Sequence, residues 1–517
     1  MKWQLQAQLN HVLQTLGYEL PTPAGLSFPA NPDFGHYATN VTFQLAKIQK
    51  TNPKLLAETI ATQLEQSPTF KGKLQCSAVN GFINFTFSND QLWALLTQLE
   101  GVSFPKTTEK ILLEYVSANP TGPLHIGHGR WAALGDSLYR ILAATGHQVQ
   151  TEFYINDAGN QVQKLYESVQ AVKAQTPIPE DGYHGAYIHD LAALGDDPLK
   201  QNLKWQHDTL AAFRTHFHSW VSEKSLQGPE KIQNVLDILR QKGLSFESEG
   251  ALWFRSTEFG DDKDRVLIKS DGANTYFLMD LVYHLDKIQR GFTLLINIWG
   301  ADHHGYVKRV RAGVQALGGE QFAQDAHFKI MIGQLVNLFR GGEPVRMSKR
   351  TGDMITLQEV IDEIGTDAAR YFLIEKSPDS HVEFDLAVAV QASSENPVYY
   401  IQYAHARLCN VLAKLADQGT PEAQSGLPQL GPDEAALIWQ CLKWSDAIWE
   451  AAQNLAPHQM AHYAWGLAKK VQLFYERCPV LKASPAEQHQ RLEIIKHAKE
   501  TLRKSLDVLG MSAPEKM

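Results

Sequence analysis

The chain has 517 residues, of which 44% are hydrophobic and 20% charged, and its formal net charge is −8. This length is typical of two to four globular domains, and the acidic balance argues against a generic nucleic-acid coat, although not against a local basic surface that binds one RNA. No stretch approaches the ~18 consecutive apolar residues of a membrane span, and residues 1–20 lack the features of a signal peptide, so we expect no membrane association and a cytoplasmic location.

Residues 1–100 are predicted to form a small N-terminal α+β domain. A helix is expected from Trp3 to about Leu16, and a second helical run from about Val41 to Leu64. The stretch QCSAVNGFINFTFS then alternates apolar and polar residues around a turn, which is typical of a β-hairpin. The following residues, 101–110, have little periodicity and are expected to be a linker.

Residues 101–385 are predicted to form a Rossmann-like domain with a parallel sheet. A buried strand at 111–116, a Pro/Gly-rich loop, a helix from about Arg130 to Ala144 and a second strand at 148–157 make one βαβ unit. The range of about 163–250 is mostly helical and polar, and it is predicted to be an insertion. Strand-like runs return at 251–256, 265–270, 275–280 and 293–300.

Residues 386–517 are predicted to form an all-α helical bundle. Strand signals end near Asp385, and four long segments beyond it have apolar residues at helical spacing. The fold class is therefore multidomain α/β, with the parallel-sheet domain between a small α+β domain and a helical bundle.

Two histidines, His125 and His128, lie in the loop after the first strand of the βαβ unit. Such a loop opens at the ligand crevice of an α/β sheet, and the following helix N-terminus attracts phosphates. Gly122, Gly127 and Gly129 lack a Cβ and let a base or phosphate come close. Imidazole N–H groups can stabilise phosphate charge in a transition state, so this pattern favours a nucleotide site.

A zinc site is the alternative interpretation of this histidine pair. His303 and His304 could complete it, but position 126 is Ile, so the activating Glu of an HExxH motif is missing. The chain has four cysteines, and they are too far apart in sequence for a CxxC ligand pair: Cys76, Cys409, Cys441 and Cys478. Their spacing fits reduced cytosolic thiols better than a set of disulfide bonds.

A basic segment, PVRMSKRTG at 344–352, lies more than 200 residues after the histidines. Arg346, Lys349 and Arg350 could close over a triphosphate and stabilise displacement at its α-phosphate. Three basic residues in isolation would more often be a solvated turn. Together with the histidine loop, however, the segment resembles the HIGH and KMSKS signatures of class I aminoacyl-tRNA synthetases.

The whole chain resembles a bacterial-type arginyl-tRNA synthetase. The motifs that carry this resemblance keep the order of that family: PANPDFGHYATNVTFQLAK, ANPTGPLHIGHGR, FYINDAGNQ, DGANTYFLMDLVYHLDK, WGADHHGY, EPVRMSKRTG, SPDSHVEFD, ENPVYYIQYAHAR and LGMSAPEKM. The resemblance implies that residues 1–100 are an additional tRNA-binding domain and residues 386–517 an anticodon-binding domain.

The resemblance implies catalytic roles for His125, His128 and Lys349. ATP contacts are implied for the two histidines and for Gly127, Gly129, Met347, Ser348 and Lys349. Arg346 replaces the first lysine of the KMSKS signature and Arg350 replaces its final serine, so the separate roles of these two arginines stay open.

The resemblance also implies an arginine pocket. Tyr276 and Asp280 match the pair that recognises the guanidinium group, and a carboxylate is its strongest specific partner. On spacing alone, an ordinary helix-start tyrosine and a surface aspartate are the favoured interpretation. The other residues that we expect in the arginine pocket are Glu114, Ser117 and Asn119, and those that we expect to line the ATP or arginine site are Asp302, His303 and His304.

The implied activity is that of an arginine–tRNA ligase with L-arginine, ATP and tRNA(Arg) as substrates. Mg²⁺ is expected to arrive with the nucleotide, without a dedicated protein site. A monomer is expected. The alternatives are a HIGH-type synthetase for another amino acid, a catalytically silent tRNA-binding relative and, more remotely, a zinc hydrolase.

Overall fold

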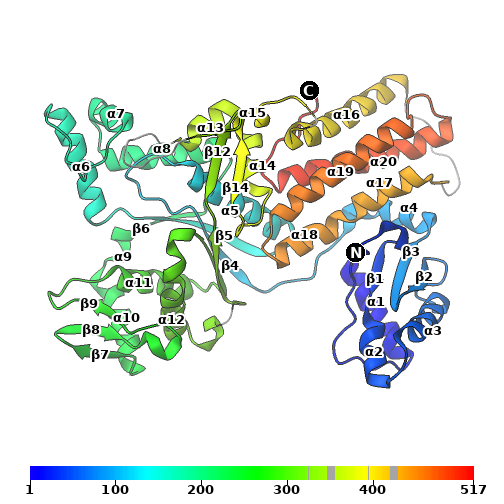
Figure 1. Ribbon diagram of the computed structural model, residues 1–517, viewed down its shortest axis with the longest axis horizontal. Helices are drawn as coiled ribbons and strands as arrows, with labels where there is room; N and C mark the ends of the chain where they lie inside the picture. Colours follow the sequence, from blue (N-terminus) through cyan, green and yellow to red (C-terminus); the bar gives the residue numbers. More distant parts are fainter. Residues whose placement is uncertain (324, 346–354, 394, 420–428) are drawn as a thin grey trace.

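The computed structural model describes residues 1–323, 325–345, 355–393, 395–419 and 429–517. In Figure 1 the parallel-sheet region lies at one end of an elongated molecule, and the N-terminal domain lies at the other end, beside the C-terminal helices. None of the helices described in these ranges is long and apolar enough to cross a membrane. The predicted fold class is confirmed, and the predicted domain limits stay predictions.

The N-terminal domain packs helices on a small antiparallel sheet of order β1-β3-β2. Its elements are α1 (Lys2–Thr15), β1 (Tyr37–Thr39), α2 (Val41–Gln49), α3 (Pro53–Gln66), β2 (Leu74–Val79) and β3 (Phe82–Phe87), followed by α4 (Asn89–Thr97). The predicted hairpin is β2 and β3, joined at Asn80 and Gly81 with φ values of 52° and 89°, which a two-residue primed turn requires. The single helix predicted for 41–64 is wrong, because left-handed Lys50 and helix-starting Pro53 divide it.

The central sheet has five parallel strands in the order β11-β10-β4-β5-β6. They are β4 (Lys110–Glu114), β5 (Gln148–Ile155), β6 (Ser219–Ser222), β10 (Leu294–Gly300) and β11 (Phe328–Gly333). From β4 the chain first extends the sheet through β5 and β6, and it then returns to add β10 on the other side of β4. The switch point therefore lies between the carboxyl ends of β4 and β10, where parallel sheets bind ligands.

Helix α5 (Ile126–Ala144) connects β4 to β5 and is almost entirely buried. It begins four residues before the predicted start at Arg130, because the His125 side chain accepts a hydrogen bond from the Gly127 N–H and acts as the N-cap. A Cβ on Gly135 would lie 2.2 Å from the ring of Tyr115, so glycine here lets α5 pack closely on the chain after β4.

The range predicted as a helical insertion contains both added helices and part of the sheet. Its helices are α6 (Asn160–Lys173), α7 (Ala186–Leu194), α8 (Pro198–Ala212), α9 (Glu223–Leu226) and α10 (Pro229–Gln241). Strand β6, in the same range, pairs with β5 in the central sheet. Strands β7 (Ser245–Ser248), β8 (Ala251–Phe254) and β9 (Arg265–Ile268) form a separate antiparallel sheet.

The strand predicted at 275–280 is wrong, because this segment begins helix α11 (Tyr276–Gln289). The Thr275 hydroxyl caps the helix by accepting from the Leu278 N–H at 3.3 Å. The apolar run continues with helical period and buries one face against the core beside α10 and α12 (Val307–Gly318). Tyr276 and Asp280 are consequently one helical turn apart.

The chain after β11 forms a third region that joins the sheet to the C-terminal helices. It contains β12 (Val336–Arg340), β13 (Glu343–Pro344), β14 (Val382–Asp385), α13 (Leu357–Ile364), α14 (Thr366–Ile374) and α15 (Leu386–Ala389). Beyond it, the described residues are helical, as predicted: α16 (Pro397–Gln418), α17 (Pro432–Leu442), α18 (Trp444–Gln453), α19 (His458–Arg477) and α20 (Pro485–Asp507). One hydrophobic core runs from α5 through α14 into this bundle.

Gly135→Ala should destabilise the protein by about 1–3 kcal/mol or more, because the added methyl group overlaps the buried Tyr115 ring. Gly466→Ala in α19 is the control: its Cβ would meet only Gln440 Nε2 at 3.5 Å, and alanine favours helix, so stability should be unchanged or rise by about 0.5–1 kcal/mol. Urea unfolding of both variants measures the difference. Equal midpoints would contradict this account of α5 packing.

Candidate active site

The strained turn after β4 forms one wall of the crevice at the switch point. Val116 and Ser117 have φ values of 68° and 43°, a region that β-branched residues rarely adopt. The Ser117 hydroxyl compensates by donating to Glu114 Oε1 at 3.0 Å and accepting from the Tyr154 N–H at 3.2 Å. The turn therefore fixes Glu114 and Ser117, two predicted arginine-site residues, beside β5.

His125 and His128 lie together at the start of α5. Their rings stack with centroids 3.7 Å apart, and His128 Nδ1 accepts from the His125 backbone N–H at 3.2 Å. Both side chains are half-buried. The two imidazoles thus share the end of α5 that bears the positive helix dipole, which suits a phosphate group.

Gly127 and Gly129 differ in what surrounds them. A Cβ on Gly127 would lie 2.9 Å from the His125 ring, so glycine permits the capping conformation of that histidine. Gly129 is buried, and its Cβ would lie 2.6 Å from Leu357 of α13. Packing thus explains glycine at both positions, and their ATP contacts stay predictions.

The described chain that follows the predicted KMSKS-like segment contacts the histidine loop. The Leu357 N–H donates to the Leu124 carbonyl at 2.7 Å, and Thr356 forms an antiparallel bridge with His125. Arg346, Met347, Ser348, Lys349 and Arg350 themselves lie outside the described residues. Their roles stay predictions.

Glu114 is buried and already has a cationic partner. Lys287 Nζ, which is fully buried on α11, forms an ion pair with Glu114 Oε2 and lies 3.3 Å from Asn297 Oδ1 of β10. A buried carboxylate needs such a partner to offset its lost hydration. Glu114 is consequently placed to hold α11 against the sheet, and its predicted arginine contact stays a prediction.

Asp280 forms no ion pair with a described residue, although the nearby Lys287 ammonium group acts to lower its pKa. Its Oδ2 accepts from the Tyr306 hydroxyl at 2.5 Å. Burial raises the pKa of Asp280 to about 7, the hydrogen bond from Tyr306 opposes this shift, and the nearby Glu114 and Glu223 carboxylates add to it. A guanidinium group would relieve both burial and repulsion, as the predicted role requires.

Tyr276 lies at the exposed start of α11, with 69% of its surface accessible. It borders a cavity of about 730 Å³ that also includes Glu223, Tyr306 and Arg309. Its hydroxyl group would lie 3.4 Å from a Cβ on Gly159, in the loop after β5. Tyr276 is therefore accessible to a ligand that reaches Asp280 from the crevice.

The remaining predicted residues lie at the rim. Asn119 is exposed and donates to Gln161 Oε1 at 2.6 Å. Asp302, His303 and His304 are all exposed in the 3₁₀ turn 301–306 that follows β10. This turn leads to Tyr306, and the predicted pocket roles of these four residues stay predictions.

The described part of the chain has no cluster of three or more His, Cys, Asp or Glu side chains that could hold a metal ion. The histidine pair at 303–304 lies in the loop after β10, whereas His125 and His128 lie at the start of α5. A zinc site built on His125 and His128 therefore gains no support from this part of the chain.

Sequence reasoning missed three site residues. Tyr306 and Lys287 lie inside the quoted motifs WGADHHGY and DGANTYFLMDLVYHLDK, so the motifs contained the signal without assigning the roles. Glu223, the first residue of α9, is buried, and this burial raises its pKa. Nothing in its local sequence indicates that it faces Asp280 across the cavity wall.

A five-stranded parallel sheet, two histidines at the start of α5 and a helical C-terminal bundle match the architecture of a class I aminoacyl-tRNA synthetase. Three family models match the chain: the N-terminal domain of arginyl-tRNA synthetase over residues 4–87, the catalytic domain of class I (R) tRNA synthetases over 92–194 and 197–412, and the DALR anticodon-binding domain over 401–517.

Sequence alignments with known relatives extend over nearly the whole chain. Arginine–tRNA ligase 1 of Halalkalibacterium halodurans is 40% identical over 100% of this chain and 99% of its own length, and the arginine–tRNA ligase of Bacillus subtilis is 41% identical over 95% and 94%. The structure of Thermus thermophilus arginyl-tRNA synthetase has the same fold, with a TM-score of 0.82 at 22% identity and complete coverage of both chains. The chain belongs to the arginyl-tRNA synthetase family.

The kcat/KM for arginine should fall below pH 7, because protonated Asp280 cannot pair with a guanidinium group. At pH 6 the loss should be roughly tenfold relative to the alkaline plateau. Tyr306→Phe removes the hydrogen bond that lowers this pKa, so the acidic limb should move to higher pH.

Tyr166→Phe is the matched control, since the Tyr166 hydroxyl also donates to an aspartate, Asp197, at 3.0 Å but on the distant pair α6 and α8. Its pH profile should be that of the unaltered protein. An acidic limb that stays in place in Tyr306→Phe would contradict the assignment of the titrating group to Asp280.

Proposed function

We propose that the chain is an arginine–tRNA ligase. The observation that carries this proposal is the partly buried Asp280 carboxylate, whose Oδ2 accepts from the Tyr306 hydroxyl and which forms no ion pair with any described residue. The reaction has two steps. The arginine carboxylate attacks the α-phosphate of ATP and releases pyrophosphate, and the terminal adenosine of tRNA(Arg) then takes arginine from the adenylate and releases AMP.

In this proposal one group of residues binds the guanidinium end of arginine, and another binds its α-amino and carboxylate end. Asp280 binds the guanidinium group, and exposed Tyr276 covers it from the cavity. Ser117 and Asn119 are placed toward the α-amino and carboxylate end. His125, His128 and the α5 N-terminus stabilise negative charge on the α-phosphate as the bond to pyrophosphate breaks. Mg²⁺ arrives on the ATP phosphates and neutralises their charge.

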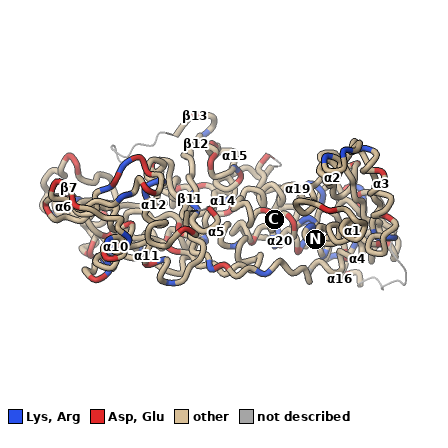
Figure 2. The backbone as a smooth tube through the Cα atoms, turned by 90° about the horizontal axis from the view of Figure 1, so that it is seen from below, with Lys and Arg blue, Asp and Glu red and all other residues tan. Residues whose placement is uncertain are grey.

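The N-terminal domain is proposed to contact tRNA through the α2–α3 corner. Lys47, Lys50 and Lys54 are exposed there, and Figure 2 shows basic positions along α2. Phe43 and Phe82 are 41% exposed, and their rings contact edge to face at 5.2 Å. Exposed aromatic rings and lysines together suit stacking on bases and contact with phosphates.

The C-terminal bundle is proposed to bind the anticodon stem, and the protein is proposed to act as a cytoplasmic monomer. Two polar residues of this bundle have partners within the protein: His405 is buried, with Nδ1 2.9 Å from the Pro514 carbonyl, and Arg503 pairs with Glu500 on its own helix. Arg407 lies between the rings of Tyr403 and Tyr475 at 4.5 and 4.4 Å.

The experiment that tests the function is ATP-dependent attachment of labelled amino acids to bulk bacterial tRNA. Arginine, lysine, glutamine and cysteine are compared in parallel. Charging with arginine alone is expected. Charging with another amino acid would favour a different HIGH-type synthetase, and no charging by folded protein that still binds ATP would favour a silent tRNA-binding relative.

His125→Ala and His128→Ala should each lower kcat for arginylation by roughly 100-fold, because each removes a donor to the transition-state phosphate. His189→Ala, an exposed histidine on α7, is the control and should leave kcat unchanged. Circular dichroism confirms that the variants are folded. Loss of less than about threefold in both active-site variants would overturn the proposed role of the pair.

A further inference from the structure

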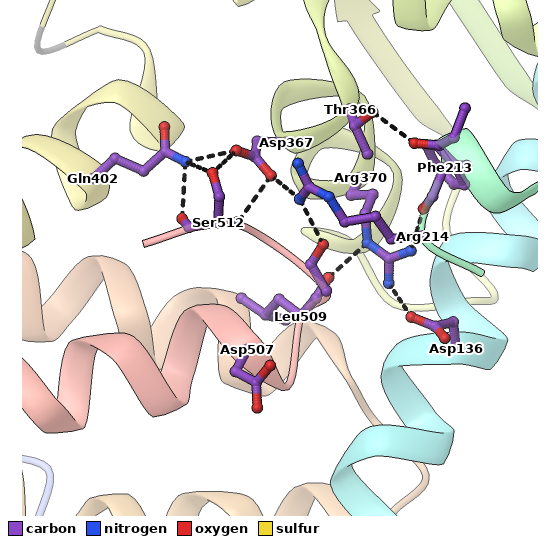
Figure 3. A network of polar contacts seen from close by, with 12 residues as sticks. Asp136, Phe213, Arg214, Thr366, Asp367, Arg370, Gln402, Asp507, Leu509 and Ser512 are labelled. Carbon is purple, nitrogen blue, oxygen red and sulfur yellow. Dashed lines mark hydrogen bonds and ion pairs between the residues drawn. The ribbon is translucent and has the colours of Figure 1, made fainter. Parts of the chain in front are cut away.

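A polar junction joins the segment after α20 to the helix that begins at the active-site histidines (Figure 3). Arg370 of α14 lies at its centre and is fully buried. Its Nη2 donates to Asp136 Oδ2 of α5 at 2.6 Å, its Nε donates to the Leu509 carbonyl at 2.8 Å, and its Nη1 donates to the Phe213 carbonyl at 2.8 Å. One planar guanidinium group therefore connects three parts of the chain.

Asp367, one helical turn before Arg370, makes the second half of the junction. Its Oδ1 accepts from the Ser512 N–H at 2.9 Å and forms an ion pair with Arg214, and its Oδ2 accepts from Gln402 Nε2 of α16 at 2.8 Å and from the Ser512 hydroxyl. Both carboxylate oxygens of Asp367 thus accept hydrogen bonds from Ser512 of the C-terminal segment, and Oδ2 also accepts one from Gln402 of the bundle.

Close packing leaves this junction little freedom. Gly510 has a φ of 68°, and a Cβ on it would lie 2.3 Å from Arg370 Nη2, so the C-terminal segment touches the guanidinium group directly. Asp136 lies eight residues after His128, which is roughly 12 Å along a helix that packs rigidly between the sheet and α18. A shift of the C-terminal segment consequently pulls on α5.

We propose that Arg370 and Asp367 are positioning residues for arginylation, through which the C-terminal bundle sets the position of His125 and His128. This inference rests on the proposed arginine–tRNA ligase function. When the bundle holds tRNA, the junction transmits the placement of the 509–512 segment to α5. The junction touches neither ATP nor arginine, so its loss should lower kcat and leave the KM for both small substrates unchanged.

The test uses Asp367→Asn and Gln402→Ala in the full-length chain, because both alter the rim of the junction and leave the buried Arg370–Asp136 pair in place. Glu434→Gln is the matched control. Glu434 accepts from Arg491 Nε at 2.7 Å and from Gln490 Nε2 at 2.8 Å, and it joins α17 to α20 inside the bundle without a link to α5. Urea unfolding measures the stability of all three variants.

Both junction variants should lower kcat for arginylation by about 3- to 30-fold at unchanged KM for arginine and ATP. Glu434→Gln should lower the free energy of unfolding about as much as the junction variants do, but it should leave kcat unchanged. If the control lowers kcat as much as the junction variants do, the effect is one of stability and the proposal is overturned.

A double-mutant cycle separates positioning from independent damage. Combined with His128→Ala, Asp367→Asn should lower kcat by a smaller factor than it does alone, because one of the two groups that it positions is absent. Fully additive losses would overturn the proposal. The unaltered protein reports separately on the function: if it does not charge tRNA with arginine, the ligase proposal fails before the junction is tested.

Discussion

Two buried arginines hold helix α5 in place, and the active site depends on that helix. Arg130, in the second turn, donates from Nη1 to the Gln334 carbonyl at 2.6 Å and from Nη2 to the Ser380 carbonyl at 2.7 Å. Arg370 binds the Asp136 carboxylate two turns further on. Arg370 is fully buried and donates from Nε, Nη1 and Nη2, so its displacement would leave buried donors without partners. The first turn of α5, with its two histidines, therefore stays at the edge of the sheet.

The rest of the site follows from how α11 is braced against that same sheet. Lys287 pairs with Glu114 at the end of β4, and Arg290 binds Glu152 of β5 through two nitrogens at 2.6 and 2.9 Å. These pairs neutralise two buried carboxylates. Asp280, nearer the start of α11, forms no ion pair with a described residue and accepts a hydrogen bond from the Tyr306 hydroxyl. Asp280 therefore stays the predicted partner of a cationic side chain.

The sequence predicts local features of this fold well. The βαβ unit, the hairpin at Asn80–Gly81 and the histidine loop all depend on signals between neighbouring segments of the sequence, and the structure has each of them. Helix α11 was expected as a strand at its start because Tyr276–Met279 is a short, continuous apolar run, and such a run does not distinguish a strand from a buried helix. Strand β6 is only four residues long, with serine at both ends, and so has no strong pattern.

Long-range partners are what the sequence does not reveal. Glu114 and Lys287 are 173 residues apart, and Asp136 and Arg370 are 234 residues apart, yet each forms a buried pair. Family resemblance named Asp280 and Tyr276 as a pair but not Tyr306, whose hydroxyl contacts Asp280 from the chain after β10. Burial and neighbouring charge, which set the pKa of Asp280, exist only once these segments meet.

The most direct test of this account is a crystal structure of the protein with a non-hydrolysable arginyl-adenylate analogue. The account expects the guanidinium nitrogens to lie within about 3.2 Å of the Asp280 carboxylate, and the adenylate phosphate mimic to lie at the first turn of α5 beside His125 and His128. A guanidinium group bound elsewhere, with Asp280 still paired only to Tyr306, would contradict it.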